Sequence, residues 1–502
     1  MINTHGLFLA IDQSTSATKG LLFSADGSLL DQEILSHRQI YPRAGWVEHD
    51  AEEIFSNTLK VTSDLMKRHS EQMSNLLALS ITNQRETFVI FDLETGKPLY
   101  NAIVWQCRRG ADLCNQLVDA GNETLVHELT GLKIDTYFPA SKLRWLVDAN
   151  PDLHARLKDG SALFGTIDTY LIYRLTGGNV YATDHTNASR TLFFDIGKLE
   201  WSQELCNVFG LEFGTLPEVR ESAAWYGDTD LAGCLSRRIP ICGVMGDSQA
   251  ALFAQRCFAP GSAKATFGTG SSILLNIGHE KRLSESGTVT ALAWVLDGQP
   301  TYAFEGIINF TGATISWLRD QLQLIESPAE TETLAQSVSD SDGVYFIPAF
   351  VGLSAPYWRA DARAAILGMT PSTTRAHVVR AALESIGYIV TDVLKAMGED
   401  AGVNLSMVHA DGGAVRNAFL MQFVADMNQL KVRAAQTPEL SALGAVFSGG
   451  LGLKHYASLE DLQNLPAGYE EYQSSISPAR ASELFAGWQS AVQQVLYQPK
   501  QG

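Results

Sequence analysis

The amino-acid sequence predicts an α/β protein with a duplicated architecture, and two observations lead to this prediction. One order of segments occurs twice: a strand, a hydroxyl-rich turn, a second strand, an Asp-Gly hairpin leading into a further strand, and a helix. The chain of 502 residues is also long enough for two or three domains. Because the second copy begins near Gly261, we expect two domains, at residues 1–254 and 255–502.

The first copy contains three predicted strands, at residues 7–11, 19–23 and 29–34, with a polar turn at residues 12–18 and an Asp-Gly pair at residues 26 and 27. An Asp-Gly pair between apolar runs is typical of a β-hairpin. A helix is expected from about Asp50, with Glu53 placed as in a capping box. Helical spacing predicts that its buried face carries Ile54, Thr58, Val61 and Leu65.

The second copy repeats this order. Strands are predicted at residues 262–267, 273–276, 288–296 and 301–305, with a turn at residues 268–272 and an Asp-Gly pair at residues 297 and 298. A helix follows through Ile315, Leu318 and Leu322, and a surface helix near the C-terminus carries Leu484, Trp488, Val492 and Leu496. One such match could arise by chance, but two in the same order favour a duplication.

Net charge limits the kinds of partner. The chain has 55 acidic and 37 basic residues, a formal net charge of −18. Such a surface repels nucleic acid and anionic lipid, so we expect neither as a partner. A few backbone amides can still hold a phosphate group locally, so a phosphorylated ligand is compatible with this charge.

The cysteines and the apolar segments indicate the compartment. None of the six cysteines forms a Cys-x-x-Cys pair, which argues against a structural zinc site and fits thiols in a reducing compartment. The N-terminus lacks a basic region followed by an apolar core, and no run of about 18 apolar residues occurs. We therefore expect a cytoplasmic protein.

Two polar runs, residues 83–87 and 105–109, each follow an apolar strand-like segment. The first contains Arg85 and Glu86, and the second begins with Trp105. An Arg-Glu pair at a strand end can grip a small polar molecule through charge-assisted hydrogen bonds. The alternative is a surface ion pair worth less than about 1 kcal/mol.

Two turns are candidate phosphate sites. The first follows Asp12 and contains Ser14, Thr15 and Ser16; the second is residues 268–270. Hydroxyls and amides in such turns can clamp a phosphate, and Asp12 can hold Mg²⁺ through waters. The first turn alone is equally well explained as an ordinary hairpin, and the second alone is better explained as a simple turn. As counterparts in the duplication, however, they could enclose a nucleotide's phosphates.

Two helix starts complete the candidate site. Asp247 opens an apolar helix and is well placed as a general base that takes a proton from a substrate hydroxyl; the alternative is a capping residue. The paired glycines in residues 411–417 suit close approach to a nucleotide, or form a turn without a ligand. The chain lacks the Gly-x4-Gly-Lys-Ser/Thr, Gly-x-Gly-x-x-Gly, His-Glu-x-x-His and Gly-x-Ser-x-Gly motifs. These absences argue against a P-loop enzyme, a dehydrogenase, a metalloprotease and an α/β-hydrolase.

Together these residues resemble the FGGY family of carbohydrate kinases, and among them the glycerol kinases. The resemblance covers nearly the whole chain and is carried by residues 39–50, 81–87, 101–109, 183–191 and 349–358. It implies a duplicated actin-like ATPase (ribonuclease H-like) fold with two domains around a deep cleft. It also implies transfer of the ATP γ-phosphate to a polyol, giving sn-glycerol 3-phosphate, with Mg²⁺, in a homodimer or homotetramer.

The resemblance also implies roles by position. The polyol side would comprise Arg85, Glu86, Trp105, Tyr137, Asp247 and Ser248, with Asp247 as the catalytic base. The nucleotide side would comprise Thr15, Ser16, Lys19, Thr269, Gly312, Ser316, Gly413, Ala414 and Asn417, and the metal-associated carboxylate would be Asp12.

Four of these positions depart from the family pattern: Ser14 replaces Gly, Lys19 replaces Arg, and Ser248 and Ser316 each replace Gln. Because the side chain of Ser248 is short, a kinase for another acceptor remains an alternative: erythritol, xylulose, ribulose or dihydroxyacetone. Ser14 leaves a second alternative, a weakly catalytic, sugar-sensing protein.

Overall fold

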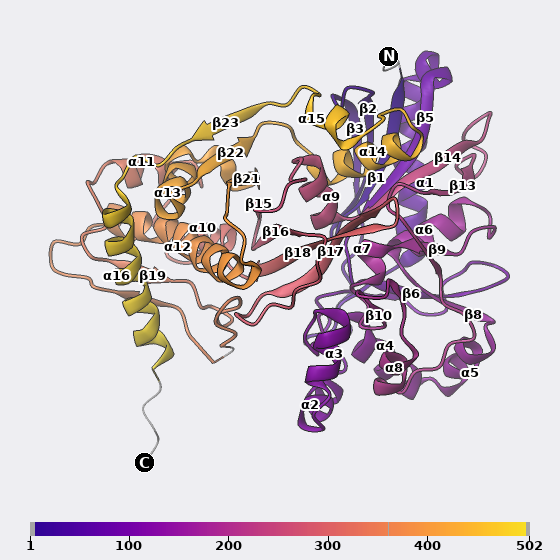
Figure 1. Ribbon diagram of the computed structural model, residues 1–502, viewed down its shortest axis with the longest axis horizontal. Helices are drawn as coiled ribbons and strands as arrows, with labels where there is room; N and C mark the ends of the chain where they lie inside the picture. Colours follow the sequence, from indigo (N-terminus) through magenta and orange to yellow (C-terminus); the bar gives the residue numbers. More distant parts are fainter. Residues whose placement is uncertain (1–5, 360, 498–502) are drawn as a thin grey trace.

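Two large mixed β-sheets form the framework of the computed structural model, which describes residues 6–359 and 361–497 (Figure 1). The first sheet has six strands in the order β13-β14-β5-β1-β2-β3. Its members are β1 (Leu7–Gln13), β2 (Ala17–Ser24), β3 (Leu29–Ser36), β5 (Leu76–Asn83), β13 (Trp225–Thr229) and β14 (Ile239–Gly246). All seven residues of β1 are buried, as expected of a central strand covered on both faces.

The second sheet has seven strands in the order β17-β18-β16-β15-β21-β22-β23. Its members are β15 (Ser262–Phe267), β16 (Ser271–Gly278), β17 (Val289–Leu296), β18 (Gln299–Ile308), β21 (Met407–Gly412), β22 (Lys431–Ala435) and β23 (Tyr469–Tyr472).

Five strands of each sheet share one order and one set of directions. β1 runs antiparallel to β2 and parallel to β5, and β15 runs antiparallel to β16 and parallel to β21. The series β14-β5-β1-β2-β3 thus corresponds to β22-β21-β15-β16-β18, which confirms the predicted duplication. The two Asp-Gly hairpins are not equivalent, because the second joins β18 to an additional edge strand, β17.

The helices and smaller strands fill the space around these sheets. The α-helices are α1 (Ala51–Arg68), α2 (Ala111–Asp119), α3 (Glu123–Thr130), α4 (Pro139–Ala149), α5 (Pro151–Asp159), α6 (Ile167–Leu175), α7 (His185–Ala188), α8 (Gln203–Val208), α9 (Asp247–Ala254), α10 (Gly312–Asp320), α11 (Glu330–Gln336), α12 (Arg375–Ala401), α13 (Ala418–Asn428), α14 (Leu440–Gly452), α15 (Leu459–Gln463) and α16 (Pro478–Leu496). Two 3₁₀ helices are η1 (Ser70–Asn75) and η2 (Gly413–Arg416).

The remaining strands form one four-stranded sheet and three strand pairs. The sheet is β4 (Glu48–His49), β7 (Ala102–Ile103), β6 (Phe88–Asp92) and β8 (Ala162–Thr166); the pairs are β9 (Ala182–Asp184) with β12 (Glu218–Arg220), β10 (Phe194–Asp195) with β11 (Glu200–Trp201), and β19 (Tyr345–Ile347) with β20 (Ala365–Leu367).

Local sequence signals explain where the predicted helices begin and end. The Asp50 side chain accepts from the amides of Glu52 and Glu53 at the start of α1. Glu53 does not complete a capping box, because its carboxylate binds Arg38 instead. The predicted apolar face of α1 is buried. Helix α10 ends before Leu322, which is 40% exposed, so the predicted pattern there is one turn too long.

Helix α14 departs from a simple division of the chain into halves. It follows strand β22 of the second sheet, yet it packs against α9, β14 and β5 beside the first sheet (Figure 1). Glycines make this close packing possible: a Cβ at Gly444 would lie 1.8 Å from the carbonyl oxygen of Ala250, and one at Gly449 would lie 2.4 Å from that of Cys242. The segment before α14 therefore connects the two sheets.

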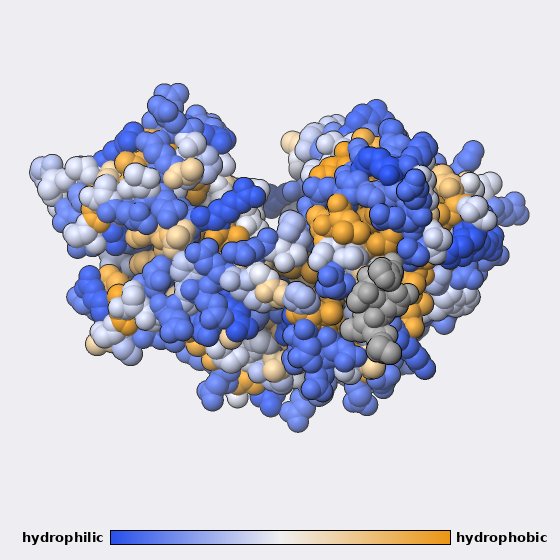
Figure 2. Space-filling model, turned by 90° about the horizontal axis from the view of Figure 1, so that it is seen from above, coloured by the Kyte–Doolittle hydropathy of each residue, from blue (hydrophilic) through white to orange (hydrophobic). Residues whose placement is uncertain are grey.

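Viewed from above, the molecule is hollowed between its two halves (Figure 2). One apolar core lies around β15, β16 and α12, and two lie around β1, β5 and β6. A fourth core, around α9 and α14, contains buried residues of both sheets and joins the two halves. Of the helices within residues 6–359 and 361–497, none combines the length and apolar character needed to cross a bilayer.

Candidate active site

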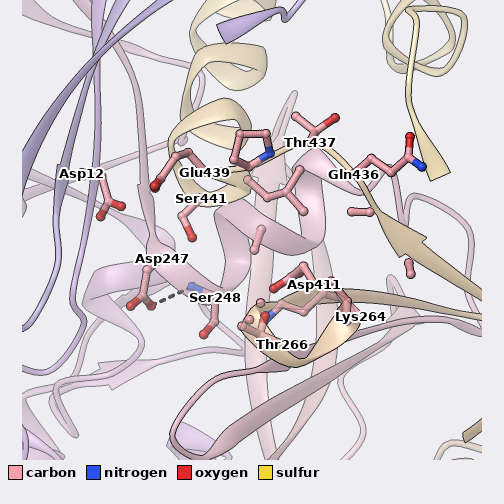
Figure 3. A pocket seen from close by; sticks show the side chains of 18 of the residues that line it. Asp12, Asp247, Ser248, Lys264, Thr266, Asp411, Gln436, Thr437, Glu439 and Ser441 are labelled. Atoms are coloured by element: carbon pink, nitrogen blue, oxygen red, sulfur yellow. Dashed lines mark hydrogen bonds between the residues drawn. The ribbon is translucent and has the colours of Figure 1, made fainter. Parts of the chain in front are cut away.

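A cavity of about 650 Å³ opens between the two sheets. Its walls come from the ends of β1, β2 and β15, the start of α9, the turn after β21, and the segment from β22 to the start of α14 (Figure 3). Residues from both halves of the chain therefore face one space. Of the predicted site residues, the lining includes Asp12, Lys19, Asp247, Ser248 and Gly413.

Asp247 is the first residue of α9, directly after β14. Its side chain is 39% exposed and faces the cavity. One carboxylate oxygen accepts from the Ser248 amide at 2.7 Å and lies 3.3 Å from Nε of Arg85. The carboxylate is thus held at a helix start while one edge stays open, as a general base requires.

Arg85 belongs to a buried network of four charged side chains. Its Nη2 donates to Oε1 of Glu305 at 2.7 Å, and its Nε lies 3.7 Å from Oε1 of Glu86. Arg190 joins the same two carboxylates, with Nε 2.6 Å from Glu86 and Nη1 2.8 Å from Glu305. Two cations thus balance two anions, which offsets the desolvation that an unpaired buried charge would suffer.

The network shifts the pKa values of its carboxylic acids in opposite directions. Burial alone would raise the pKa of Glu305, but the guanidinium groups of Arg190 and Arg85 lower it to about 2. Burial raises the pKa of Glu86, although Arg85 and Arg190 oppose that effect. Glu305 is therefore the more firmly ionised partner of Arg85.

Aromatic side chains adjoin this network. The rings of Trp105 and Tyr137 lie with centroids 5.2 Å apart. The buried ammonium group of Lys142 donates to the carbonyls of Trp105 at 3.3 Å and Tyr137 at 3.0 Å. The indole Nε1 of Trp105 donates to Oγ1 of Thr15 at 3.0 Å. This last contact links the predicted polyol side to the first predicted phosphate turn.

The first phosphate turn, residues 14–16, joins β1 to β2. Ser14 closes it, because its amide and its hydroxyl both donate to the carbonyl of Ala17. The carbonyl of Thr15 accepts from Nε2 of Gln39 at 3.0 Å and contacts Nε2 of His37 at 3.0 Å. The Ser14 side chain therefore folds back on the turn.

Lys19 and Asp12 are cross-strand partners at the cavity wall. Nζ of Lys19 lies 2.5 Å from Glu439, which precedes α14, and 3.4 Å from Asp12. Burial raises the pKa of Asp12 to about 6; Lys19 opposes this shift, and Glu439 and Asp247 add to it. Asp12 is thus a buried oxygen donor with incomplete charge compensation.

The second phosphate turn packs on the start of α10. The Gly312 amide donates to the Gly268 carbonyl at 3.0 Å, and the Thr311 amide donates to that of Thr269 at 3.1 Å. A Cβ at Gly312 would lie 2.5 Å from the Gly268 carbonyl oxygen. Thr269 and Gly312 therefore lie together, with Ser316 one turn further along α10.

The residues after β21 differ in whether they line the cavity. Gly413 lines the cavity, whereas Ala414 and Asn417 lie outside the described lining. Asn417 caps α13, accepting from the Leu420 amide at 2.9 Å, and its Nδ2 donates to Oγ1 of Thr331 at 3.1 Å. Its amide therefore already has structural partners.

Sequence reasoning missed four residues that the fold brings to the site: Arg190, Glu305, Glu439 and Lys264. Arg190 lies in one of the runs that carry the family resemblance, and Glu305 is within a predicted strand. A charged residue within an apolar strand was the available signal for Glu305 and Lys264, because such a charge needs a partner.

Family models match most of the chain. The model for the N-terminal domain of the FGGY family of carbohydrate kinases matches residues 7–254, and the model for the C-terminal domain matches residues 263–453. The chain belongs to the FGGY family of carbohydrate kinases. The resemblance in the sequence is thereby confirmed, and so is the two-domain α/β kinase fold.

Individual FGGY members are similar over nearly their whole length. A glycerol kinase of Symbiobacterium thermophilum is 46% identical over 488 residues, which cover 97% of this chain and 98% of the relative. Glycerol kinase 1 of Thermotoga maritima is 44% identical, with 97% and 99% coverage. The crystal structure of Plasmodium falciparum glycerol kinase with ADP superposes with a TM-score of 0.94 at 35% identity, covering 98% of this chain and 99% of that one.

Proposed function

We propose that this FGGY kinase transfers the γ-phosphoryl group of ATP to glycerol, giving sn-glycerol 3-phosphate. The observation that carries the proposal is the position of Asp247, which lies between the buried Arg85 network and the open cavity. Similarity to glycerol kinases over almost the entire chain supports glycerol as the acceptor.

In this mechanism, Arg85 and Glu86 bind adjacent hydroxyls, and Trp105 and Tyr137 cover the carbon backbone. Asp247 takes the proton of the acceptor hydroxyl. The acceptor oxygen then forms a bond to the γ-phosphorus as the bond to the β,γ-bridging oxygen breaks, and ADP leaves with those electrons. Positioning and charge stabilisation supply most of the rate in such transfers.

We assign the nucleotide side to the two phosphate turns, the start of α10 and the segment after β21. The terminal phosphate is bound by Thr15, Ser16 and Lys19. The rest of the nucleotide is bound by Thr269, Gly312, Ser316, Gly413, Ala414 and Asn417. Bound Mg²⁺ neutralises phosphate charge. Among the described residues no three potential ligands are grouped, but Mg²⁺ in kinases uses one or two carboxylates with phosphates and waters. The buried, oxygen-donating Asp12 fits that chemistry.

The test is ADP release by the purified protein with Mg²⁺-ATP and glycerol, with the product identified by ³¹P NMR and by a dehydrogenase specific for sn-glycerol 3-phosphate. Rapid ADP release with formation of sn-glycerol 3-phosphate is expected. Release with a longer acceptor but not with glycerol would refute glycerol as the substrate. ATP binding without release on any acceptor would instead favour a sugar sensor.

A second candidate is an FGGY kinase for erythritol, xylulose, ribulose or dihydroxyacetone. The observation that favours it is a pair of short hydroxyl side chains beside the base: Oγ of Ser248 lies 3.4 Å from Oγ of Ser272, which lies 3.4 Å from Oε1 of Glu305. Small side chains leave room for a longer acceptor and can bind an extra hydroxyl. If this candidate holds, Ser248→Gln should reduce turnover of the longer acceptor more than that of glycerol.

We also propose a cytoplasmic homodimer or homotetramer, with domains at residues 1–254 and 255–502. Free thiols at all six cysteines support a reducing compartment. The two family matches, at residues 7–254 and 263–453, support the division of the chain.

A further inference from the structure

Lys264 is a buried cation without a direct partner. It lies in the middle of β15 with 1% of its surface exposed, and it makes no hydrogen bond or ion pair with any residue in the described part of the chain. A buried ammonium group normally has a partner, because desolvating an unpaired charge is costly. Its presence without one needs an explanation.

The side chain faces the cavity described above. Lys264 and Thr266, two residues apart on one face of β15, both line that space (Figure 3). The Thr266 hydroxyl, next to Asp411, is buried and makes no hydrogen bond of ordinary geometry. A cation and a hydroxyl thus lie side by side in the wall of the same polar cavity.

An anion is favoured locally at Lys264, although carboxylates outnumber cations in the cavity lining as a whole. Five carboxylates line it, from Asp12, Asp247, Asp411, Glu439 and Glu470, against three cationic side chains, Lys19, Lys264 and Arg416. Lys19 is already paired with Glu439 and Asp12, and Arg416 is exposed. Lys264 is therefore the buried lining cation whose hydrogen-bond donors are available to a ligand.

We propose that Lys264, together with the Thr266 hydroxyl, binds the phosphate groups of the nucleotide from the second sheet. This inference rests on the proposed function, which places a nucleotide in the cavity. It adds a cation to the C-terminal side of the site, where the residues assigned above contribute glycines, hydroxyls and amides. Lys19 and Lys264 then hold the phosphates from opposite sheets.

The competing explanation is that Lys264 only compensates Asp411, whose charge acts on it at longer range. The two explanations differ in their ligand dependence. A phosphate contact matters only for ligands that carry phosphate, whereas structural compensation affects the cavity for every ligand.

The experiment measures dissociation constants for adenosine, AMP, ADP and ATP by titration calorimetry with Mg²⁺ present. We expect Lys264→Met to weaken ADP and ATP binding about 10- to 100-fold, the range for a hydrogen bond to a charged group, while adenosine binding is unchanged. Thr266→Val should cause a smaller loss of affinity for ADP and ATP. Lys67→Met, at an exposed site on α1, is the matched control.

Equal affinities of wild type and folded Lys264→Met for ATP would overturn the inference, as would an equal loss for adenosine. If Lys264→Met does not fold, Thr266→Val decides in the same way: an unchanged ATP affinity overturns the proposal. Absence of ATP binding by the wild-type protein would instead overturn the proposed function itself, so the two failures are distinguishable.

Discussion

Buried charge dominates the chemistry of individual residues at this site. Arg85, Glu86, Arg190 and Glu305 are almost fully buried and touch one another, while Asp247 at their margin remains partly open. In the proposed mechanism these residues have separate tasks: the network binds and orients hydroxyl groups, and the accessible carboxylate takes a proton.

Replacing Asp247 with Asn should lower kcat about 10²- to 10⁴-fold, the usual range for loss of a general base. Nucleotide affinity should remain, since the phosphate turns are untouched. Steady-state kinetics and calorimetry measure the two effects, and Asp119→Asn at the exposed end of α2 serves as the control. Retention of kcat by Asp247→Asn would contradict the assigned role.

Replacing Arg190 with Met should destabilise the protein by about 3–5 kcal/mol, because Glu86 and Glu305 would stay buried with one cation between them. Urea unfolding measures the free energy. The double variant Arg190→Met with Glu86→Gln removes one uncompensated charge and should recover part of the loss. A double variant less stable than the sum of the two single variants would argue against this charge balance.

Strand ends and helix starts position these residues. The turn at residues 14–16 is supported from β4 and its neighbourhood: His49 contacts Oε1 of Gln39 at 2.9 Å, and Gln39 donates to the Thr15 carbonyl. On the opposite side of the first sheet, α14 supports α9, which begins at Asp247. Each support comes from a segment far from the site in sequence.

Gly444→Ala should destabilise the protein by about 1–3 kcal/mol, because its Cβ would meet the Ala250 carbonyl oxygen in α9 at 1.8 Å. The resulting shift of α9 should also lower kcat. Gly398→Ala in α12 is a matched helical control with only ordinary contacts, and it should be neutral or stabilising by about 1 kcal/mol. Thermal unfolding that ranks the two variants equally would refute the packing argument.

The support from His49 predicts a pH dependence of stability. Burial lowers the pKa of His49 to about 3 in the folded protein, from an ordinary value of 6.5. Its neutral form therefore contributes stability in full above pH 6.5. That contribution is lost as the pH falls from 6.5 toward 3, at about 1.4 kcal/mol per pH unit.

Urea unfolding of wild type and His49→Gln at several pH values between 4.5 and 7.5 tests this expectation (pH values chosen at about one-unit spacing). The stability difference between the two proteins should shrink as the pH falls, because only the wild type has this histidine to protonate on unfolding. Parallel stability curves would show that burial does not hold His49 neutral.

The molecule as a whole places its candidate chemistry between two sheets of matching topology. The molecule is hollowed between its two halves (Figure 2), and the Asp247 side chain at the cavity is 39% exposed (Figure 3). Phosphoryl transfer to an alcohol requires water to be kept from the γ-phosphate, so closure of the two halves around both ligands is expected.

Small-angle X-ray scattering should therefore record a smaller radius of gyration with glycerol and a non-hydrolysable ATP analogue together than without ligands. Asp247→Asn should still close, since it retains the binding surfaces on both sheets. An unchanged radius of gyration with both ligands at saturating concentration would contradict closure of the two halves.

Sequence patterns alone were sufficient for the duplicated α/β architecture, the two turns and the position of Asp247 at a helix start. These features depend on neighbouring residues: alternating strands, helical spacing and Asp-Gly hairpins are local signals. The run of residues around Arg85 and Glu86 likewise predicted a polar site at a strand end.

Only the tertiary structure decided which charges share that site. Glu305 is 220 positions from Arg85 in the chain, and Glu439 is 420 positions from Lys19. No local pattern encodes such pairs, because they meet only when strand order and the return of α14 bring distant segments together. Lys264 follows the same rule: β15 is readable in the sequence, but the unpaired cation facing the cavity is a property of the folded chain.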